Sequence, residues 1–225
     1  GNSGAASLSV TESAWALNGG NAVVVLFSGK NVSALSATYA TLPMTVASYK
    51  DANNVYNGIA YIIGDALPTT GNVVISATYG YVNSNNVLRY AYRLLSLSNV
   101  ASAGSSATRS SAGTLSYSTS TNNSYVFGVA SNNEWRVSAI SATGNANNIY
   151  YQGNPGYYNT LLVHGPVATT GSNTDTYSGT ITGAVTLPFN AKTTANPLLA
   201  GSGQKISGLA FEEGAVTISG SKLEL

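Results

Sequence analysis

The sequence predicts an all-β protein, an antiparallel β-sandwich with almost no helix. Short apolar or alternating runs recur along the 225-residue chain, and clusters of Gly, Asn and Pro separate them. Apolar residues make up 44% of the composition, which is enough for a sizeable core. No stretch combines helical periodicity with capping residues. We therefore expect one large β domain or two smaller ones.

The first part of the chain is expected to supply seven strands. ASLSVTE (6–12) alternates apolar and polar residues, whereas AVVVLF (22–27) is continuous and predicts a central strand buried on both faces. In LRYAYRLLSL (88–97) the alternation places Tyr92 and Arg93 on opposite faces. The remaining strands are expected at VSALSATY (32–39), MTVASY (44–49), VYNGIAYII (55–63) and NVVISATY (72–79).

A change of composition divides the chain after these strands. SNVASAGSSATRSSAG (98–113) offers little to bury and predicts a linker or a long crossing loop. Residues 191–225 are expected to form a C-terminal extension with a hairpin from KISGLAF (205–211) and AVTISG (215–220). Between them, strands are expected at TLSYSTS (114–120), SYVFGVA (124–130), WRVSAISA (135–142), TLLVHG (160–165), TYSGTIT (176–182) and AVTLPF (184–189).

Short echoes in the same order indicate two related halves. VSALSAT returns as VSAISAT, ANNVY as ANNIY, and TTGN as TTGS. We therefore expect residues 1–190 to form a β-sandwich built from halves at about 1–97 and 114–190, each with a similar set of strands. Unrelated strand orders in the two halves would contradict this hypothesis.

Charge argues against several classes of partner. Only 8% of the residues are charged and the net charge is +1, with the basic residues scattered along the chain. Without a basic stripe, nucleic-acid binding is not expected. A nearly neutral surface has little self-repulsion, which favours association with other copies. No apolar run is long enough to cross a bilayer, no signal peptide is recognised at the start, and the lack of cysteine excludes disulfides and thiolate metal sites.

Residues for catalysis or metal binding are sparse. The single histidine, His164, is expected to pack or to hydrogen-bond at a strand end, because no partner for a triad can be named. Asp51, Asp65 and Asp175 lie beside turn residues, where Asx turns account for them. A loose calcium site near Asp51 is the one metal alternative left open. We expect no enzyme activity, no catalytic residue and no cofactor.

The segment YYQGNPGYY (150–158) is the most distinctive surface candidate. Asn154-Pro155-Gly156 predicts a turn, so the flanking tyrosines are expected near a loop tip. Hairpin decoration, subunit contact and glycan stacking all remain open, and no converging polar groups favour the glycan. The residues proposed for assembly or glycan contact are Tyr150, Tyr151, Tyr157, Tyr158, Trp15 and Trp135.

Several of these runs together resemble a known class of module. AVVVLF, VSALSATY, LPMTVASY, YNGIAYII, LPTTGNVVISATY and LRYAYRLLSL are similar to the β-sandwich modules of phage structural proteins, in tails, fibres and head decorations, and of some secreted bacterial proteins. The resemblance covers about residues 20–190. Such modules often carry Gly-Gly after the tyrosine, where this chain has Ala40-Thr41. The resemblance implies a jelly-roll-like, non-enzymatic building block and transfers no site residues.

The expected function is therefore that of a structural protein on a virion, as a capsid decoration, tail or fibre component. Its partners would be further copies of itself and other structural subunits, at the virion surface or outside the cell. Both ends of the chain are candidates for strand addition to a neighbouring subunit. The alternatives are a lectin-like module that binds surface glycans and a filament subunit joined by donor strands.

Overall fold

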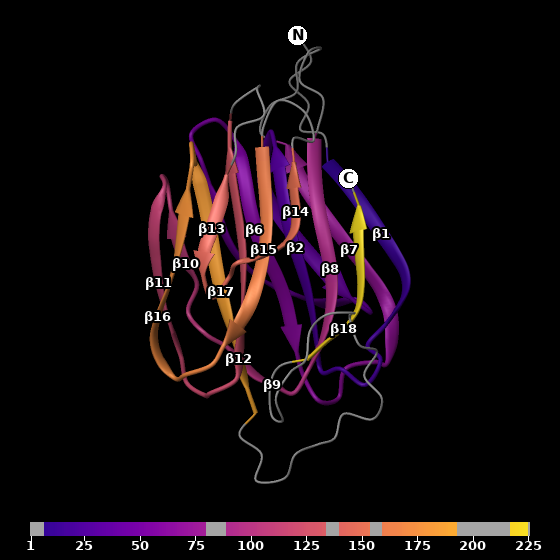
Figure 1. The fold of residues 1–225 in the computed structure, drawn as a ribbon. Helices are drawn as coiled ribbons and strands as arrows, with labels where there is room; N and C mark the ends of the chain where they lie inside the picture. Colours follow the sequence, from indigo (N-terminus) through magenta and orange to yellow (C-terminus); the bar gives the residue numbers. More distant parts are fainter. Residues whose placement is uncertain (1–6, 80–88, 134–139, 154–158, 193–216, 225) are drawn as a thin grey trace.

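A computed structural model describes residues 7–79, 89–133, 140–153, 159–192 and 217–224. Within these residues all regular structure is β-strand and neighbouring strands pair antiparallel (Figure 1). The prediction of an all-β antiparallel sandwich is confirmed. The described part of the chain contains no helix able to span a membrane.

The first half of the chain, together with β18, forms two sheets. The first outer sheet has the order β1-β7-β3-β4, and the first inner sheet has the order β18-β8-β2-β6-β5. The strands of the outer sheet are β1 (Ser7–Ala16), β7 (Thr70–Tyr79), β3 (Val32–Tyr39) and β4 (Leu42–Pro43). Those of the inner sheet are β18 (Thr217–Glu224), β8 (Arg89–Ser98), β2 (Ala22–Lys30), β6 (Val55–Ile63) and β5 (Thr45–Lys50).

The second half forms two further sheets. The second inner sheet has the order β10-β17-β12-β15-β14, with β9 also paired to β17, and the second outer sheet has the order β11-β16-β13. The inner strands are β9 (Val100–Ala103), β10 (Ala107–Arg109), β17 (Gly183–Ala191), β12 (Ser124–Asn132), β15 (Asn159–Val167) and β14 (Asn148–Gly153). The outer strands are β11 (Gly113–Thr119), β16 (Gly171–Ser178) and β13 (Ser141–Gly144).

The two halves share one strand order. The path β8-β2-β6-β5 of the first inner sheet corresponds to β17-β12-β15-β14 of the second, and β1-β7-β3 corresponds to β11-β16-β13. Related halves require such a correspondence. The TTGN and TTGS echoes fall at the starts of β7 and β16, which are equivalent strands. ANNVY and ANNIY run into the first residues of β6 and β14, which are not equivalent strands, so this echo does not follow the topology.

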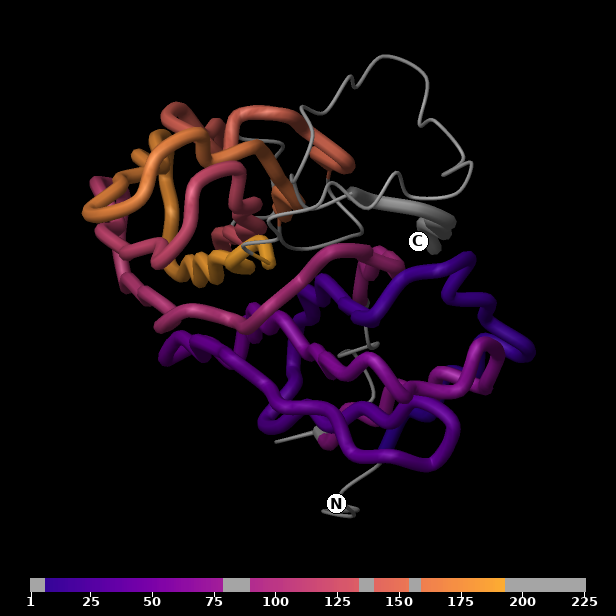
Figure 2. The backbone as a smooth tube through the Cα atoms, turned by 90° about the horizontal axis from the view of Figure 1, so that it is seen from below, coloured from indigo at the N-terminus to yellow at the C-terminus, as the bar shows by residue number. Residues whose placement is uncertain are grey.

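Three apolar layers hold the four sheets together. In β2, Val23, Val25 and Phe27 pack against the first outer sheet. Val24 and Leu26, which alternate with them, pack against the second inner sheet. All five side chains are inaccessible to solvent, and full burial stabilises each by about 1.5–3 kcal/mol. The continuous apolar run of β2 thus reflects its place between two packed layers, and Figure 2 shows the halves lying side by side across the middle layer.

Two expectations about connecting segments need correction. The tract 98–113 is no plain linker, because β9 and β10 lie within it and both pair with β17. Backbone hydrogen bonds suffice for this pairing, so small side chains do not prevent it. TYSGTIT was placed too late, since the strand is β16, Gly171–Ser178. The expected strand at 205–211 lies outside the described residues.

Both expected end strands pair within the chain. β1 lies on β7 at the edge of the first outer sheet. Near the expected strand at 215–220, β18 pairs with β8 at the edge of the first inner sheet. The described structure therefore gives each end strand a partner in its own chain.

Candidate functional site at the β14 edge

β14 carries the tyrosine segment that the sequence singles out, and it forms an edge of the second inner sheet. It pairs with β15 on one side, and no described strand pairs with the other. A register shift between Ile149 and Tyr151 leaves Tyr150 as an extra residue. Strict alternation would send Tyr150 and Tyr151 to opposite faces, but both pack against the layer between the halves. The bulge thus turns two neighbouring aromatic rings toward the first half.

Tyr150 lies in a stack of side chains that joins the two halves. Its ring stacks on the His164 imidazole with centroids 3.8 Å apart and an interplanar angle of 18°. Across the interface, the Arg93 guanidinium carbon lies 4.6 Å from the Tyr150 ring centroid. Such cation–π contacts contribute about 0.5–2 kcal/mol, more when water is excluded. Arg93 comes from β8 and His164 from β15, so the stack connects the first inner sheet to the second.

The Tyr125 ring completes this stacked cluster, which we define as Arg93, Tyr150, His164 and Tyr125. The Tyr125 and His164 rings lie 5.6 Å apart at 20°, and the Tyr125 hydroxyl hydrogen-bonds to His164 Nδ1. Only 5% of His164 is exposed. Burial, and then the nearby Arg93 charge, lower the pKa of His164 to about 4. The imidazole is therefore neutral at pH 7 and takes part in packing.

The tyrosine hydroxyls of this cluster are weak acids. Burial raises the pKa of Tyr125 and that of Tyr150. The Tyr150 hydroxyl is buried and has no hydrogen-bond partner among the described residues. Leaving such a group unpaired costs about 1–3 kcal/mol. The raised pKa values of both hydroxyls mean that neither tyrosine ionises near neutral pH.

Ile149, next to Tyr150, is the most exposed large apolar side chain of the described chain, at 52%. Leu42 on β4, at the edge of the first outer sheet, is also exposed at 41%. Each of these strands pairs with a described strand on one side only. β4 has just two residues and Pro43 has no N–H to donate, so of these two strands only β14 presents an edge on which a further strand could pair. An exposed edge with an apolar side chain is a natural place for another chain to pair.

The other residues proposed for contact differ in their surroundings. Trp15 is partly buried against the core of the first half, and its indole Nε1 donates to Ser96 Oγ at 2.7 Å. Tyr151 is partly buried in the layer between the halves. Trp135, Tyr157 and Tyr158 lie outside the described residues. The structure therefore brings Tyr150 and Tyr151 together and leaves Trp15 in a separate place.

Two of the carboxylates accept hydrogen bonds from backbone N–H groups and so hold connecting segments in place. Asp51 Oδ1 accepts hydrogen bonds from the backbone N–H groups of Asn53 and Val55, both at 2.8 Å, which is the expected Asx-type turn. Asp175 differs from the expectation, because it lies within β16 and is fully buried. Its Oδ1 accepts from the Ala146 N–H at 2.9 Å, and burial raises its pKa.

The side chains that could bind a metal do not cluster among the residues described. No three of the histidine and carboxylate side chains in that part of the chain lie close enough together to hold an ion.

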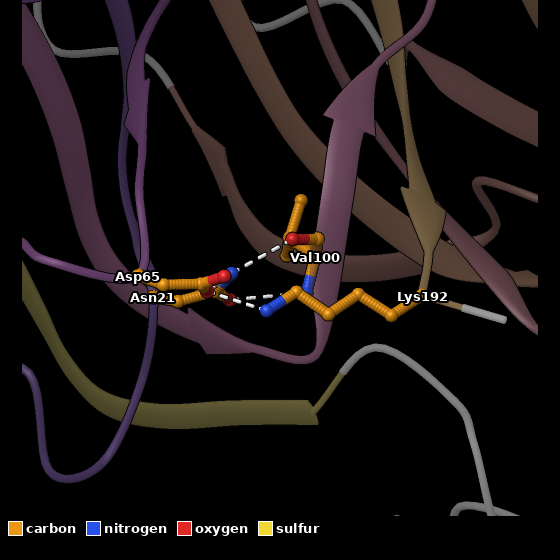
Figure 3. Close-up of polar contacts among 4 residues, drawn as sticks. All are labelled: Asn21, Asp65, Val100 and Lys192. Carbon is orange, nitrogen blue, oxygen red and sulfur yellow. Dashed lines mark hydrogen bonds and ion pairs between the residues drawn. The ribbon is translucent and has the colours of Figure 1, made fainter. Parts of the chain in front are cut away.

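A second polar cluster fixes how the halves meet, and Figure 3 shows it. We call it the Asn21 cluster: Asn21, Asp65, Val100 and Lys192. The Asn21 side chain donates to the Val100 carbonyl at 2.7 Å and to Asp65 Oδ1 at 2.9 Å. It also accepts from the Val100 N–H at 3.0 Å. Lys192, at the end of the second half, forms an ion pair with Asp65. The Asn21 amide thus binds both backbone groups of Val100, the first residue of β9, and ties that strand to the first half.

No family model, curated protein or solved structure matches this chain. The function must therefore be argued from the chain's own residues.

Three residues of this region were not recognised as site residues from the sequence: Arg93, Tyr125 and Ile149. Alternation in LRYAYRLLSL does place Arg93 on the face away from Tyr92, so its inward position was a usable signal. Ile149 and Tyr125 had no comparable signal. Ile149 lies next to the bulge in β14, and Tyr125 of β12 meets His164 because β12 pairs with β15.

Proposed function

We propose that the chain is a non-enzymatic structural protein that assembles into a larger body through strand edges. The observation that carries the proposal is the position of Ile149 and Leu42. These large apolar side chains are exposed on β14 and β4, at edges of two different sheets. A single subunit would then offer contacts in two directions, as an extended array needs.

The use of the titratable groups supports a structural role. His164 is neutral at pH 7 and stacked between two tyrosines, and Asp175 holds a turn beneath the second outer sheet. These groups stabilise the fold and the contact between halves. The low and nearly balanced charge lowers the repulsion between copies.

We further propose that the larger body is a virion, with this chain as a capsid decoration, tail or fibre component. The resemblance of residues 20–190 to phage structural modules is the support for this assignment. The jelly-roll arrangement implied by the resemblance is part of the same proposal.

The test is the association of the full chain and of one edge variant. Sedimentation velocity and negative-stain electron microscopy should reveal ordered assemblies that grow with protein concentration. Ile149→Lys places a charge at the proposed contact, and loss of a central apolar contact costs about 1–2 kcal/mol or more. We expect association about tenfold weaker or worse.

Thr174→Lys is the matched control, because Thr174 is exposed on β16, the central strand of the second outer sheet. This variant should assemble like the parent chain. A chain that stays monomeric at all concentrations would refute the proposed function, and equal effects of both lysines would refute the role of the β14 edge.

A further inference from the structure

We propose that β18 is an exchangeable strand: β18 of one copy completes the β8 edge of a second copy, linking chains head to tail. The inference rests on the proposed function, and it names the partner, a second copy of this chain, and the segment that binds it. In the single chain β18 occupies the same edge of its own first half.

The β8 edge is built to be covered. β18 pairs along it from Thr217 opposite Ser98 to Glu224 opposite Tyr92, with one irregularity between Ser219 and Ser221. β8 itself is buried on both faces, with Leu94 and Leu95 fully inaccessible in opposite layers. Without β18, a strand in the middle of the molecule would present unpaired backbone groups, which readily recruit another strand.

Because the halves share one strand order, the segments that cover the equivalent edge strands β17 and β8 can be compared. At the edge of the second inner sheet, β17 is covered by β9 and β10. These strands follow the first half directly, with only Asn99 between β8 and β9. The segment that leaves one half therefore completes the inner sheet of the half that follows it.

β18 is the segment that leaves the second half, and it covers β8, the strand equivalent to β17. Within the described chain it returns to the first half, where it pairs with β8. In a row of copies, the half that follows is the first half of the next copy. The rule seen at β9 then places β18 on the β8 of that neighbour.

The chain between β17 and β18 is long enough for both arrangements. Residues 192–216 separate Ala191 from Thr217. This stretch can reach about 80 Å when extended, at about 3.3 Å per residue. Ala191 pairs with Val100 and Thr217 pairs with Ser98, two positions earlier in the chain. The closed form therefore needs a span of at most about 20 Å, from strand spacings of about 4.8 Å and about 3.3 Å per residue along the chain.

A long connection also weakens the preference for the strand's own chain. The effective concentration of a tethered partner falls as its tether grows beyond the needed span. The closed and exchanged forms make the same backbone hydrogen bonds, so protein concentration decides between them. The Asn21 cluster keeps Lys192 on the first half through Asp65 and through its N–H to the Asn99 carbonyl at 2.9 Å. Exchange then involves β18 alone, with the halves still joined.

The absence of cysteine in the chain allows a direct test. One full chain carries Ser98→Cys and a second full chain carries Thr217→Cys, at positions that pair directly. Residues opposite each other on antiparallel strands come near the separation that a disulfide needs. The two chains are mixed at high concentration, unfolded and refolded together, and oxidised. We expect a disulfide between the two different chains, at least tenfold above the control mixture.

The control mixture combines Ser116→Cys and Thr174→Cys chains. Ser116 and Thr174 are exposed and pair directly between β11 and β16, inside one half. Random collisions should give this pair the same background as any other. A third chain carrying both Ser98→Cys and Thr217→Cys measures the closed form, since its disulfide then lies within one molecule.

The outcomes separate the two proposals. If the mixture gives no more than the control, exchange is overturned, whether the double variant closes within one chain or does not close at all. Assemblies of the parent chain in sedimentation, without the mixed disulfide, would leave the proposed function standing and remove only the exchange. A parent chain that forms no assemblies would remove the proposed function. Deleting residues 217–225 should leave only the assemblies that form through the other contacts, with fewer copies per assembly in sedimentation, and assemblies of unchanged size would also overturn the exchange.

Discussion

Protonation of His164 should weaken the folded state, because the imidazole is buried neutral beside a cation. Burial and the Arg93 charge bring its pKa from about 6.5 to about 4 on folding. Between these values the unfolded chain binds a proton that the folded chain does not. The contribution of His164 to the free energy of unfolding should therefore be greatest above about pH 6.5 and fall as the pH drops toward 4. The pKa difference corresponds to about 3 kcal/mol, since one pH unit is worth about 1.36 kcal/mol.

The assay is urea unfolding followed by aromatic fluorescence at several pH values between about 7 and 4. Other groups titrate in this window, and Asp175 acts in the opposite direction because its pKa is raised on folding. The decisive quantity is therefore the difference between the parent chain and His164→Gln, which cannot titrate. Asp175 packs beneath the second outer sheet, away from the layer that holds His164, and its contribution should cancel.

We expect the parent chain to lose about 3 kcal/mol more than His164→Gln across this range. Parallel pH profiles for the two proteins would refute the stacked cluster as a desolvated, neutral site. A parent chain that becomes more stable as the pH falls would refute the sign of the argument.

Three further changes test the layer between the halves, each by urea unfolding. Gly183→Ala would place a Cβ 2.9 Å from Asn57 Nδ2, and such overpacking should cost about 1–3 kcal/mol; an unchanged midpoint would contradict the close packing there. Tyr150→Phe removes a buried hydroxyl without a described partner, so it should be neutral or stabilising by up to about 1 kcal/mol, whereas Tyr150→Ala should cost about 3 kcal/mol or more. Equal losses in these two variants would contradict the stack. Asn21→Ala should cost about 1–3 kcal/mol, because both backbone groups of Val100 lose their side-chain partner, while Asn21→Asp should retain the bond from its N–H.

Burial patterns made most of the strands predictable, but not the pairing of the small-residue segments. β2 and β12 were visible as continuous apolar runs because each is covered on both faces. β9 and β10 were hidden because Ser, Ala and Gly give no side-chain periodicity, while their backbone bonds to β17 leave no mark on the sequence. Composition indicates what a segment can bury, and it says little about where its backbone hydrogen bonds go.

The candidate site was predictable in place but not in orientation. The tyrosine segment was recognised, and an Asn-Pro-Gly turn argued for rings near a loop tip. One extra residue in β14 instead turns Tyr150 onto His164 and under Arg93. A bulge shifts every later side chain by one face, and alternation in a single sequence cannot reveal it.

The contact between halves explains how edges could build a regular body. Within the apolar layer, Ser28 Oγ donates to Asn57 Oδ1 at 3.1 Å, and Asn57 Nδ2 donates to Ser131 Oγ at 2.8 Å. All three side chains are fully buried. The Asn57–Ser131 bond crosses from one inner sheet to the other, so sliding the sheets past each other would break it and leave the Asn57 amide without this partner in an apolar layer, at a cost of about 1–3 kcal/mol. The halves therefore meet in one arrangement, and the edges at β4, β14 and β8 keep a constant relation to one another. That constancy is what a repeated contact needs, because the rotation between successive copies decides whether they close into a ring or extend as a filament.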